Sequence, residues 1–540
     1  MIRNALLGLL ISLGAILAIL LCLGFGPTDI ARMFAHPVQG GVDLAVAEDV
    51  APIQPQGPAE TKPFGTLNLL VLAAYLALML GVGLACGRRV QSARGFFVAE
   101  GQMNHVVVGL SILGTYLSAL TMMGLPGMAY GKHDWTYMVQ LPFLVITAVV
   151  VTRFVLPHYR KTGTASIYTF LEERIGTSVR MIAAGSFVVF AIGRMGLVLY
   201  LPALAFNTVT GVPLPTCIVV MGIVITIYTV IGGIEAVVWT DAIQVVIFVL
   251  GAFVTLGFIF SDLGVEQFLA IGLEHNKFRI VEPSLDLTRI TSLWLILETL
   301  FQTIRIYGTQ QDVAQRYMTT RSIEDARRSI WIGIIAYIPI GFVFYFIGTA
   351  LFAFYTAHPE IGLPGKADPI YPFFVVNQLP AGVAGLVIAA IFAAAMSSID
   401  SAMNSASTVC VEDFWQRFAK QKATDQSVLA TARRLTLLWG ILAILMGLAF
   451  METEYAQILW GKMMAVTTNG VLGLIALALI PIRIRASAAL IGFLAATAGL
   501  YLMMRTEINF LLWPVIGNTT GFLVALGVNA LGHGGRNDVT

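Results

Sequence analysis

Hydrophobic segments of about 20 residues recur along the whole chain, separated by short polar connections. A helix needs about 20 mainly apolar residues to cross a bilayer, and only helices or closed barrels satisfy their backbone hydrogen bonds there. The pattern therefore predicts an all-α polytopic membrane protein with about 14 transmembrane helices. The predicted spans cover residues 5–25, 67–87, 104–131, 134–157, 177–209, 213–233, 236–261, 291–317, 328–356, 374–412, 430–451, 457–482, 486–503 and 508–531.

The composition supports this class. Of the 540 residues, 57% are hydrophobic and 11% are charged, whereas soluble domains carry about 25% charged residues. A soluble enzyme, a nucleic-acid binder and a disordered scaffold are therefore excluded, and the net charge of +2 gives no reason to expect a polyanion partner. The four cysteines lie far apart in apolar segments, which is not the spacing of a disulfide framework or a metal site.

Basic residues fall in alternate connections between the predicted spans. With Arg3 in the cytoplasm, every second connection is rich in Arg and Lys, including the one that contains Arg316, Arg321, Arg327 and Arg328. Positively charged connections are retained in the cytoplasm. The alternation therefore predicts a protein of the cell (inner) membrane with both termini in the cytoplasm.

The first apolar segment, 5–25, has two interpretations. Arg3 could be the basic start of a signal peptide, but the segment is long for one and no clear small-residue cleavage site follows it. We expect an uncleaved anchor helix. Residues 27–64, rich in Pro, Gly, Asp and Glu, would then form an extracytoplasmic loop.

Among the ionisable residues inside predicted spans, four stand out: Arg194, Asp241, Glu298 and Asp400. Such a residue costs about 2.5–3.5 kcal/mol on insertion scales, so it marks a candidate transport pathway. The alternative is a structural pair between helices, or a group near a span end that reaches water. No motif surrounds Glu298, so we assign it the structural role.

The segment 374–412 carries a polar stripe. Ser397, Asp400, Ser401 and Asn404 are spaced i, i+3, i+4 and i+7 and share one face of a helix. Hydroxyl, carboxylate and amide oxygens can replace the hydration shell of an alkali cation. The alternative is that the serine side chains bond back to the preceding helical turn.

The segment 104–131 combines glycine, proline and hydroxyl residues at mid-membrane depth. Ser111, Gly114 and Thr115 precede Gly124 and Pro126. A helix that breaks at such a place exposes carbonyls to an ion and N–H groups to an anionic solute. The alternative is a small-residue face for close helix packing.

Three motifs resemble the sodium/solute symporter family. Residues 232–244 read Gly-Gly-Ile-Glu-Ala-Val-Val-Trp-Thr-Asp-Ala-Ile-Gln, similar to the family signature. Residues 394–398, Ala-Ala-Met-Ser-Ser, resemble its ion-binding helix, and 311–317, Gln-Asp-Val-Ala-Gln-Arg-Tyr, resemble its cytoplasmic motif after core helix six. The resemblance implies a LeuT-type core of two inverted five-helix repeats, with extra N- and C-terminal helices.

The resemblance also implies a domain organisation along the chain. The expected parts are an N-terminal anchor helix and extracytoplasmic loop (1–66), an additional transmembrane helix (67–103), repeat one (104–261), an extracytoplasmic loop (262–290), repeat two (291–482), and C-terminal helices with a short tail (483–540).

By the same resemblance, five residues form the principal Na⁺ site. Ser397 and Ser398 supply hydroxyl oxygens, and Gly114, Leu117 and Ala394 supply carbonyl oxygens.

A second Na⁺ position is implied at Asp241, Asp400 and Ser401. Asp400 stands where the related proteins carry a serine. Its carboxylate either strengthens Na⁺ binding or holds a proton instead.

Within the family, the chain most resembles the bacterial sialic-acid symporters. Residues 117–121 resemble their loop for the substrate carboxylate, Arg194 matches their substrate-facing arginine, and Gln140 matches a binding glutamine. Tyr116 replaces a smaller threonine, which makes a smaller organic anion as plausible as sialic acid. The implied solute-binding residues are Tyr116, Ser118, Thr121, Gln140 and Arg194.

We therefore expect a Na⁺-coupled secondary transporter, and no enzyme, that imports a small organic solute, a carboxylate or a sialic-acid-like anion. The alternatives are a symporter for a neutral sugar or amino acid and a transporter-like membrane sensor. The expected partners are Na⁺, the solute and the lipid bilayer, without nucleic acid, and a monomer is sufficient.

Overall fold

The computed structural model describes residues 62–117, 119–131, 135–363, 370–418, 423–452, 470–503 and 505–531. Its α-helices are α3 (Thr66–Gly87), α4 (Ala93–Val98), α5 (His105–Tyr116), α6 (Ala119–Tyr130), α7 (Leu144–Val150), α8 (Leu156–Thr162), α9 (Thr169–Arg174), α10 (Thr177–Thr210), α11 (Leu214–Leu263), α12 (Val265–Glu274), α13 (Ser292–Thr309), α14 (Gln311–Met318), α15 (Ile323–Ala357), α16 (Ile370–Gln378), α17 (Val383–Val409), α18 (Gln416–Phe418), α19 (Asp425–Ala449), α21 (Ala486–Met503) and α22 (Trp513–Leu531).

The described part of the chain is a helical bundle without β-strands, in which one isolated bridge joins Met103 and Thr320. Nine of its helices are long and apolar enough to cross a membrane, or ten if α5 and α6 form one bent span. The all-helical, multi-pass prediction is therefore confirmed. The predicted span 5–25 and most of 457–482 lie outside the described residues, so the total of about 14 stays a prediction.

The predicted break in 104–131 is present. Helix α5 ends before Leu117, whose backbone is extended (φ −70°, ψ 123°), and α6 continues at 55° to it. The extended residue leaves the last carbonyls of α5 without the helical N–H groups that would follow. The chain thus places polar backbone groups between two half-helices.

Helix α11 is long enough for two spans. Its 50 residues would extend about 75 Å if straight, more than twice the hydrocarbon thickness. Gly233, at φ 54°, interrupts the helical backbone, and a Cβ there would lie 2.8 Å from the Phe96 carbonyl oxygen. The second glycine of the Gly-Gly motif is therefore required by backbone geometry.

The prediction of a single helix over 374–412 was wrong at its start. Helix α16 ends at Gln378, and α17 begins only after Gly382, which adopts φ 87°. Pro380 has no backbone N–H to donate to a helix and Gly382 has a positive φ, so together these two residues separate the elements. Hydropathy averaged along the chain does not register this boundary, because Asn377 and Gln378 are two polar residues in a long apolar stretch.

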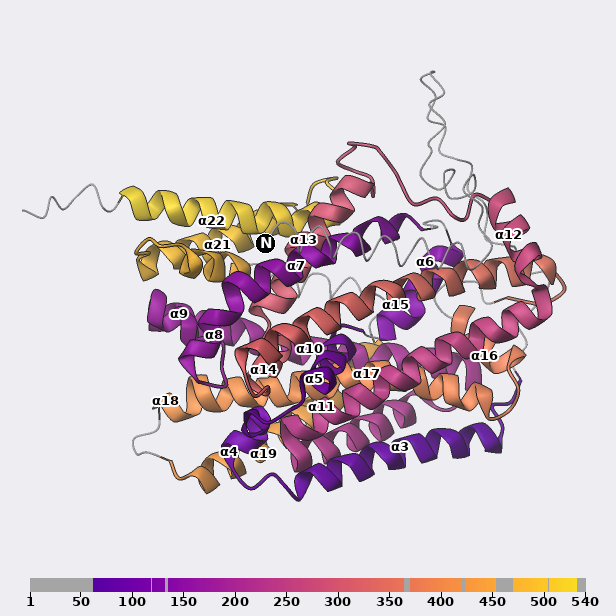
Figure 1. Ribbon diagram of the computed structural model, residues 1–540, viewed down its shortest axis with the longest axis horizontal. Helices are drawn as coiled ribbons and strands as arrows, with labels where there is room; N and C mark the ends of the chain where they lie inside the picture. Colours follow the sequence, from indigo (N-terminus) through magenta and orange to yellow (C-terminus); the bar gives the residue numbers. More distant parts are fainter. Residues whose placement is uncertain are drawn as a thin grey trace, which may run out of the picture.

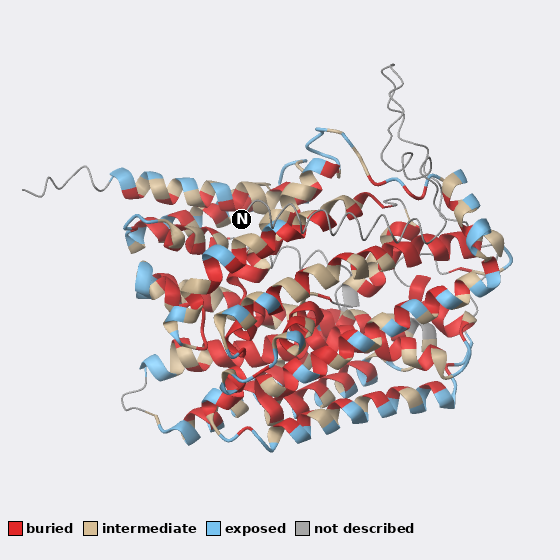
Figure 2. Ribbon diagram, viewed as in Figure 1, coloured by how far each residue is buried: buried red, intermediate tan, exposed pale blue. Residues whose placement is uncertain are grey.

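Helix α17 forms the centre of the bundle and is buried along nearly its whole length (Figures 1 and 2). Helix α3 lies along one edge of the molecule and α21 with α22 along the opposite edge, where exposed side chains are frequent (Figures 1 and 2). The polar stripe of α17 is consequently surrounded by protein.

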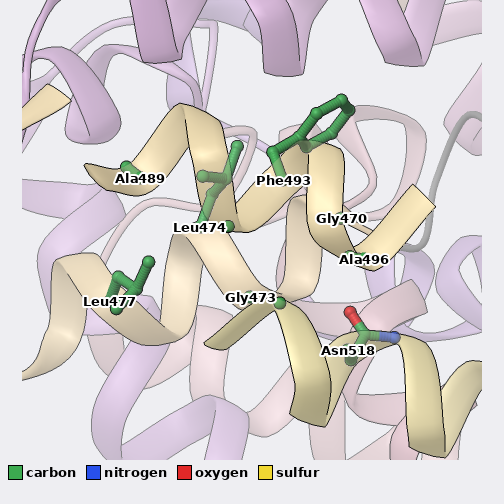
Figure 3. Close-up of a pocket in the computed structure, with 10 residues that line it drawn as sticks. Gly470, Gly473, Leu474, Leu477, Ala489, Phe493, Ala496 and Asn518 are labelled. Carbon is green, nitrogen blue, oxygen red and sulfur yellow. The ribbon is translucent and has the colours of Figure 1, made fainter. Parts of the chain in front are cut away.

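Helices α21 and α22 pack through small residues. A Cβ on Gly492 would lie 2.5 Å from the Gly521 carbonyl oxygen, so the two backbones approach closely. A small, mainly apolar pocket lies beside this contact and includes the Asn518 amide (Figure 3). It belongs to the packing of the C-terminal helices rather than to the polar centre.

A cluster of charged residues joins α9, α10 and α18. Arg417 binds Glu172 through two hydrogen bonds of 2.7 and 2.5 Å, and Arg180 donates to Glu172 at 2.8 Å. The hydrogen bonds from Arg417 lower the pKa of the Glu172 carboxyl to about 2. These bonds tie three helix ends together.

We predict that Glu172→Gln lowers the unfolding temperature at pH 7. Because the pKa is lowered in the folded state, the carboxylate stabilises the protein above its unfolded pKa of about 4.3, and this stabilisation is lost as pH falls toward 2. Thermal unfolding from pH 7 to pH 3 should show the difference shrinking. The exposed Glu173→Gln variant is the control, and an equal effect of Glu172→Gln at both pH values would contradict the assignment.

Candidate cation and solute site

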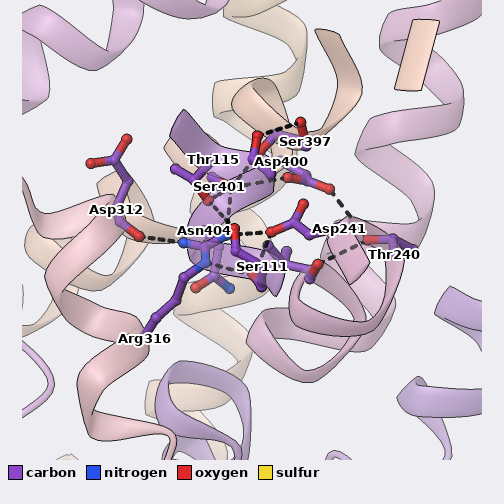
Figure 4. A network of polar contacts seen from close by, with 12 residues as sticks. Ser111, Thr115, Thr240, Asp241, Asp312, Arg316, Ser397, Asp400, Ser401 and Asn404 are labelled. Atoms are coloured by element: carbon purple, nitrogen blue, oxygen red, sulfur yellow. Dashed lines mark hydrogen bonds and ion pairs between the residues drawn. The ribbon is translucent and has the colours of Figure 1, made fainter. Parts of the chain in front are cut away.

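Three fully buried charged side chains meet at the centre of the bundle: Asp241 of α11, Asp400 of α17 and Arg316 of α14 (Figure 4). A charge removed from water is tolerated only with close partners. The contacts of each group therefore define what this centre can bind.

Arg316 connects α14 to three other helices. Its Nη2 donates to Asp241 Oδ2 at 2.7 Å and to Ser401 Oγ at 2.6 Å, and its Nε donates to Ser111 Oγ at 2.7 Å (Figure 4). Its Nη1 donates to the backbone carbonyl of Asp312. The guanidinium is thus a cation held among oxygens of α5, α11 and α17.

The prediction that Arg316 is a basic residue of a cytoplasmic connection was wrong. The chain leaves α13 at Gln310, which is extended (φ −89°, ψ 127°), and all of Gln311–Met318 is buried. Gln315 donates to the Asn404 side chain at 3.0 Å, so the motif anchors α14 to α17. A run of Gln, Asp and Arg is polar enough to suggest a loop, and only its packing reveals that it lies inside.

The residues predicted for the principal Na⁺ site converge at the end of α5. Ser397 Oγ lies 3.0 Å from the Gly114 carbonyl oxygen and 3.2 Å from the Ala394 carbonyl oxygen. The adjacent Ser398 hydroxyl is buried without a hydrogen-bond partner. Leu117 is the extended residue at the break. Neutral hydroxyl and carbonyl oxygens are ligands that suit an alkali cation, and the unpaired Ser398 hydroxyl fits one.

The residues predicted for the second cation position also lie close together. Ser401 Oγ is 3.2 Å from Asp400 Oδ1. The same hydroxyl donates to the Ser397 carbonyl at 2.5 Å, so this serine also makes the bond to the preceding helical turn that was the alternative interpretation of the polar stripe. Asp400 Oδ2 accepts from the Tyr228 hydroxyl at 2.6 Å. Asp241 Oδ1 is buried without a hydrogen-bond partner.

Two of the predicted solute-binding residues, Arg194 and Tyr116, already have partners within the protein. Arg194 pairs with Asp312 and donates from Nη2 to the Thr115 carbonyl at 3.1 Å. It therefore has the acidic partner expected if Arg194 belongs to a structural ion pair between helices. Tyr116 packs edge-on against Tyr337, with ring centroids 4.6 Å apart.

Two more of these residues are described. Gln140 accepts a hydrogen bond from Thr299 of α13, and Thr121 lies in the first turn of α6. Ser118 lies outside the described residues.

The network is one positive charge short if all its members are ionised. Its guanidiniums, Arg194 and Arg316, face three carboxylates, Asp241, Asp312 and Asp400. Two carboxylates close together in a low dielectric do not both stay ionised without a cation. The site can therefore hold one further small cation or a proton.

Comparison with known proteins identifies the family. The model of the sodium:solute symporter family matches residues 96–496. The chain belongs to the sodium:solute symporter family. It is therefore a secondary transporter that couples solute movement to Na⁺, as the sequence motifs predicted. The architecture that carries this activity is the helical bundle described above.

Individual family members match over most of their length. The sodium/sialic acid symporter NanT of Aliivibrio fischeri is 33% identical over 481 residues, which cover 86% of this chain and 94% of that protein. The sodium/sialic acid symporter SiaT of Proteus mirabilis is 32% identical and covers 84% of this chain and 93% of its own.

Solved structures agree with these matches. A substrate-bound, outward-open Na⁺-coupled sialic acid symporter with a novel Na⁺ site superimposes with a TM-score of 0.80, at 32% identity, over 87% of this chain and 98% of that one. Mhp1, a nucleobase-cation-symport-1 family transporter, superimposes with a TM-score of 0.55 at 13% identity and shares the fold alone.

We predict that Arg316→Gln lowers the free energy of unfolding by about 3–5 kcal/mol, because it leaves Asp241 buried without its partner. Adding Asp241→Asn to the same chain should restore part of the loss, since the uncompensated charge is removed as well. Thermal unfolding of the single and double variants tests this, with the exposed Arg328→Gln as control. A double variant less stable than Arg316→Gln alone would contradict the pairing.

Proposed function

We propose that this symporter carries an organic anion of the sialic-acid class into the cytoplasm together with Na⁺. The observation that carries the proposal is the convergence of Ser397, Gly114, Ala394 and the unpaired Ser398 hydroxyl at the break of α5. The names of two relatives, the sodium/sialic acid symporters NanT and SiaT, supply the solute class. The alternative within the family is a smaller carboxylate, for which a human sodium-coupled monocarboxylate transporter is a 28% identical relative.

The proposed architecture is a LeuT-type pair of inverted repeats over 104–261 and 291–482. Two features support it: α5 and α6 are separated by an extended residue, and so are α13 and α14. In such a fold, paired broken helices flank a central binding site. Both termini are proposed to lie in the cytoplasm of a bacterial cell whose inner membrane holds the protein.

Na⁺ would bind between α5 and α17 at the first site. The hydroxyls of Ser397 and Ser398 and the carbonyls of Gly114, Leu117 and Ala394 are the proposed ligands. Because these oxygens belong to two separate helices, an ion held by all of them stabilises the arrangement in which the helices are closest. An Na⁺ concentration difference and the membrane potential, worth about 2.3 kcal/mol per charge at 100 mV, then drive the cycle.

The second position would take the missing positive charge of the network. The proposed ligands of a second Na⁺ are Asp241, Asp400 and Ser401. The Oδ1 atom of Asp241 is buried and has no hydrogen-bond partner. Arg316 already neutralises part of this carboxylate charge, so one monovalent ion completes the balance.

The solute would lie beside the α5 break, near Tyr116, Ser118, Thr121, Gln140 and Arg194. Arg194 connects this region to the ion sites, because it holds both Asp312 of α14 and the Thr115 carbonyl of α5. Movement of either half-helix would therefore shift Arg194 relative to the bound solute. Rocking of one bundle against the other, with the bound solute and ions enclosed, then gives alternating access.

We predict that Ser397→Ala and Ser398→Ala each raise the half-saturating Na⁺ concentration at least about tenfold, because each removes one ion ligand. The matched control is Ser405→Ala, which removes another buried, unpaired hydroxyl from the same helix. Na⁺-dependent uptake of labelled sialic acid into proteoliposomes measures the change. Unchanged Na⁺ dependence in both site variants would refute the first ion site.

We predict that the unaltered protein takes up solute with a Na⁺ Hill coefficient above one, and that Asp400→Ser changes that coefficient or the Na⁺ affinity. A second Na⁺ requires little pH dependence above about pH 6, because ordinary carboxylates titrate near 4. Uptake is measured against Na⁺ from pH 5.5 to 8. A Hill coefficient of one whose half-saturation improves steadily with pH would assign the missing charge to a proton.

A further inference from the structure

Helix α13 carries a second pair of charged residues that the ion sites do not use. Glu298 and Arg305 lie seven residues apart, two helical turns, and Gln302 lies between them on the same face. An acid and a base inside a bundle mark a functional site more often than a surface pair would. Their contacts decide which of the two can still bind something.

Arg305 is buried, with 1% of its surface exposed, yet its hydrogen bonding is incomplete. Its Nε and Nη2 donate to Gln302 Oε1 at 3.1 and 2.9 Å, and its Nη1 has no hydrogen-bond partner. Arg194, by contrast, has both Nη atoms engaged, with Asp312 and with the Thr115 carbonyl. A buried guanidinium donor without a partner calls for an acceptor from outside the chain.

The guanidinium of Arg305 lies beside the proposed solute residues. Two carboxylates, a second guanidinium and a tyrosine are close enough to act on it electrostatically: Glu298, Asp312, Arg194 and Tyr116. One turn before Gln302, Thr299 donates to Gln140, which brings α13 against the segment 136–143. Tyr116, Gln140, Glu298 and Gln302 all keep an intermediate exposure. An acceptor that reached Arg305 would therefore also meet these side chains.

Glu298 limits what that acceptor can be. Among the described residues, no ion pair within 4.0 Å joins its carboxylate to Arg305, so the two are neighbours rather than a closed pair. The Glu298 carboxylate lies within hydrogen-bonding reach of the Thr299 hydroxyl and has room to accept further hydrogen bonds from hydroxyl or amide groups, while it repels a second anionic group. The combination suits a solute with one negative charge and several hydrogen-bond donors.

We propose that Arg305 binds the anionic group of the solute through its free Nη1, and that Glu298 accepts hydrogen bonds from the hydroxyl or amide groups of the same solute. The proposal rests on import of an organic anion as the function. It assigns the solute to the class of polyhydroxylated monocarboxylates and separates it from simple monocarboxylates, which offer Glu298 no hydroxyl or amide donor.

The test measures equilibrium binding of three probes to the purified full-length protein at saturating Na⁺. The probes are sialic acid, the uncharged sugar N-acetylmannosamine and the simple monocarboxylate pyruvate. The variants are Arg305→Gln, Arg305→Lys and Glu298→Gln, with Arg328→Gln at an exposed position as the matched control. Na⁺-dependent thermal stabilisation of each variant reports separately whether the protein folds and still binds the ion.

Arg305→Gln should weaken sialic acid binding about 10- to 100-fold, the loss expected for a charge-assisted hydrogen bond, and leave the uncharged sugar unaffected. Arg305→Lys should keep part of the affinity for sialic acid, because lysine keeps the positive charge but lacks the planar, two-pronged donor geometry of the guanidinium. Glu298→Gln should improve pyruvate binding relative to sialic acid, because the repulsion is removed along with the acceptor for hydroxyl groups. The Na⁺ response should stay unchanged in all variants.

Three results would overturn the proposal. One is unchanged sialic acid affinity in Arg305→Gln, and another is an equal loss for sialic acid and for the uncharged sugar. The third is loss of the Na⁺ response in both Arg305 variants, which would make Arg305 a structural residue. If the unaltered protein binds neither acid, the organic-anion function itself is wrong and the proposal falls with it, which distinguishes the two failures.

Discussion

Charge neutralisation at the centre of the bundle constrains every element around it. Arg316 and Asp241 are both completely buried, and each would be costly there without the other. Arg316 reaches Asp241 only because the chain breaks at Gln310 and carries α14 inward. The same guanidinium also holds Ser111 of α5 and Ser401 of α17. The Arg316 guanidinium therefore holds four helices, α5, α11, α14 and α17, in a single arrangement.

In the proposed mechanism, cations bind at oxygens of this arrangement that have no partner within the described part of the chain. The Ser398 hydroxyl and Asp241 Oδ1 have no partners, and the three carboxylates outnumber the two guanidiniums. A cation at the proposed sites would stabilise one arrangement of the α5 break relative to α17. Because Arg194 links that break to α14, the proposed ion and solute sites involve the same two half-helices. Coupling then follows from shared structure rather than from a separate relay.

Much of this organisation is predictable from the sequence, for identifiable reasons. Hydropathy predicts α3 and α21 to within one residue, because isolated apolar helices end where polar residues begin. Helical spacing also predicts the stripe of Ser397, Asp400 and Ser401. The pairing of Arg194 with Asp312 is not predictable, because the two residues are 118 positions apart. The break at Gln310 and the burial of Arg316 were missed for a different reason: a polar motif looks the same in a loop and in a sealed interior.

Na⁺-coupled transport by this route requires Na⁺ and solute to stabilise the same arrangement of the central helices. The most direct measurement is the reciprocal one on the purified protein: sialic acid affinity with and without saturating Na⁺, and Na⁺ affinity with and without saturating sialic acid. The account predicts that each ligand tightens the other by the same factor, as linkage requires, and that K⁺ does not replace Na⁺. Sialic acid affinity that is equal in Na⁺ and K⁺ would contradict it.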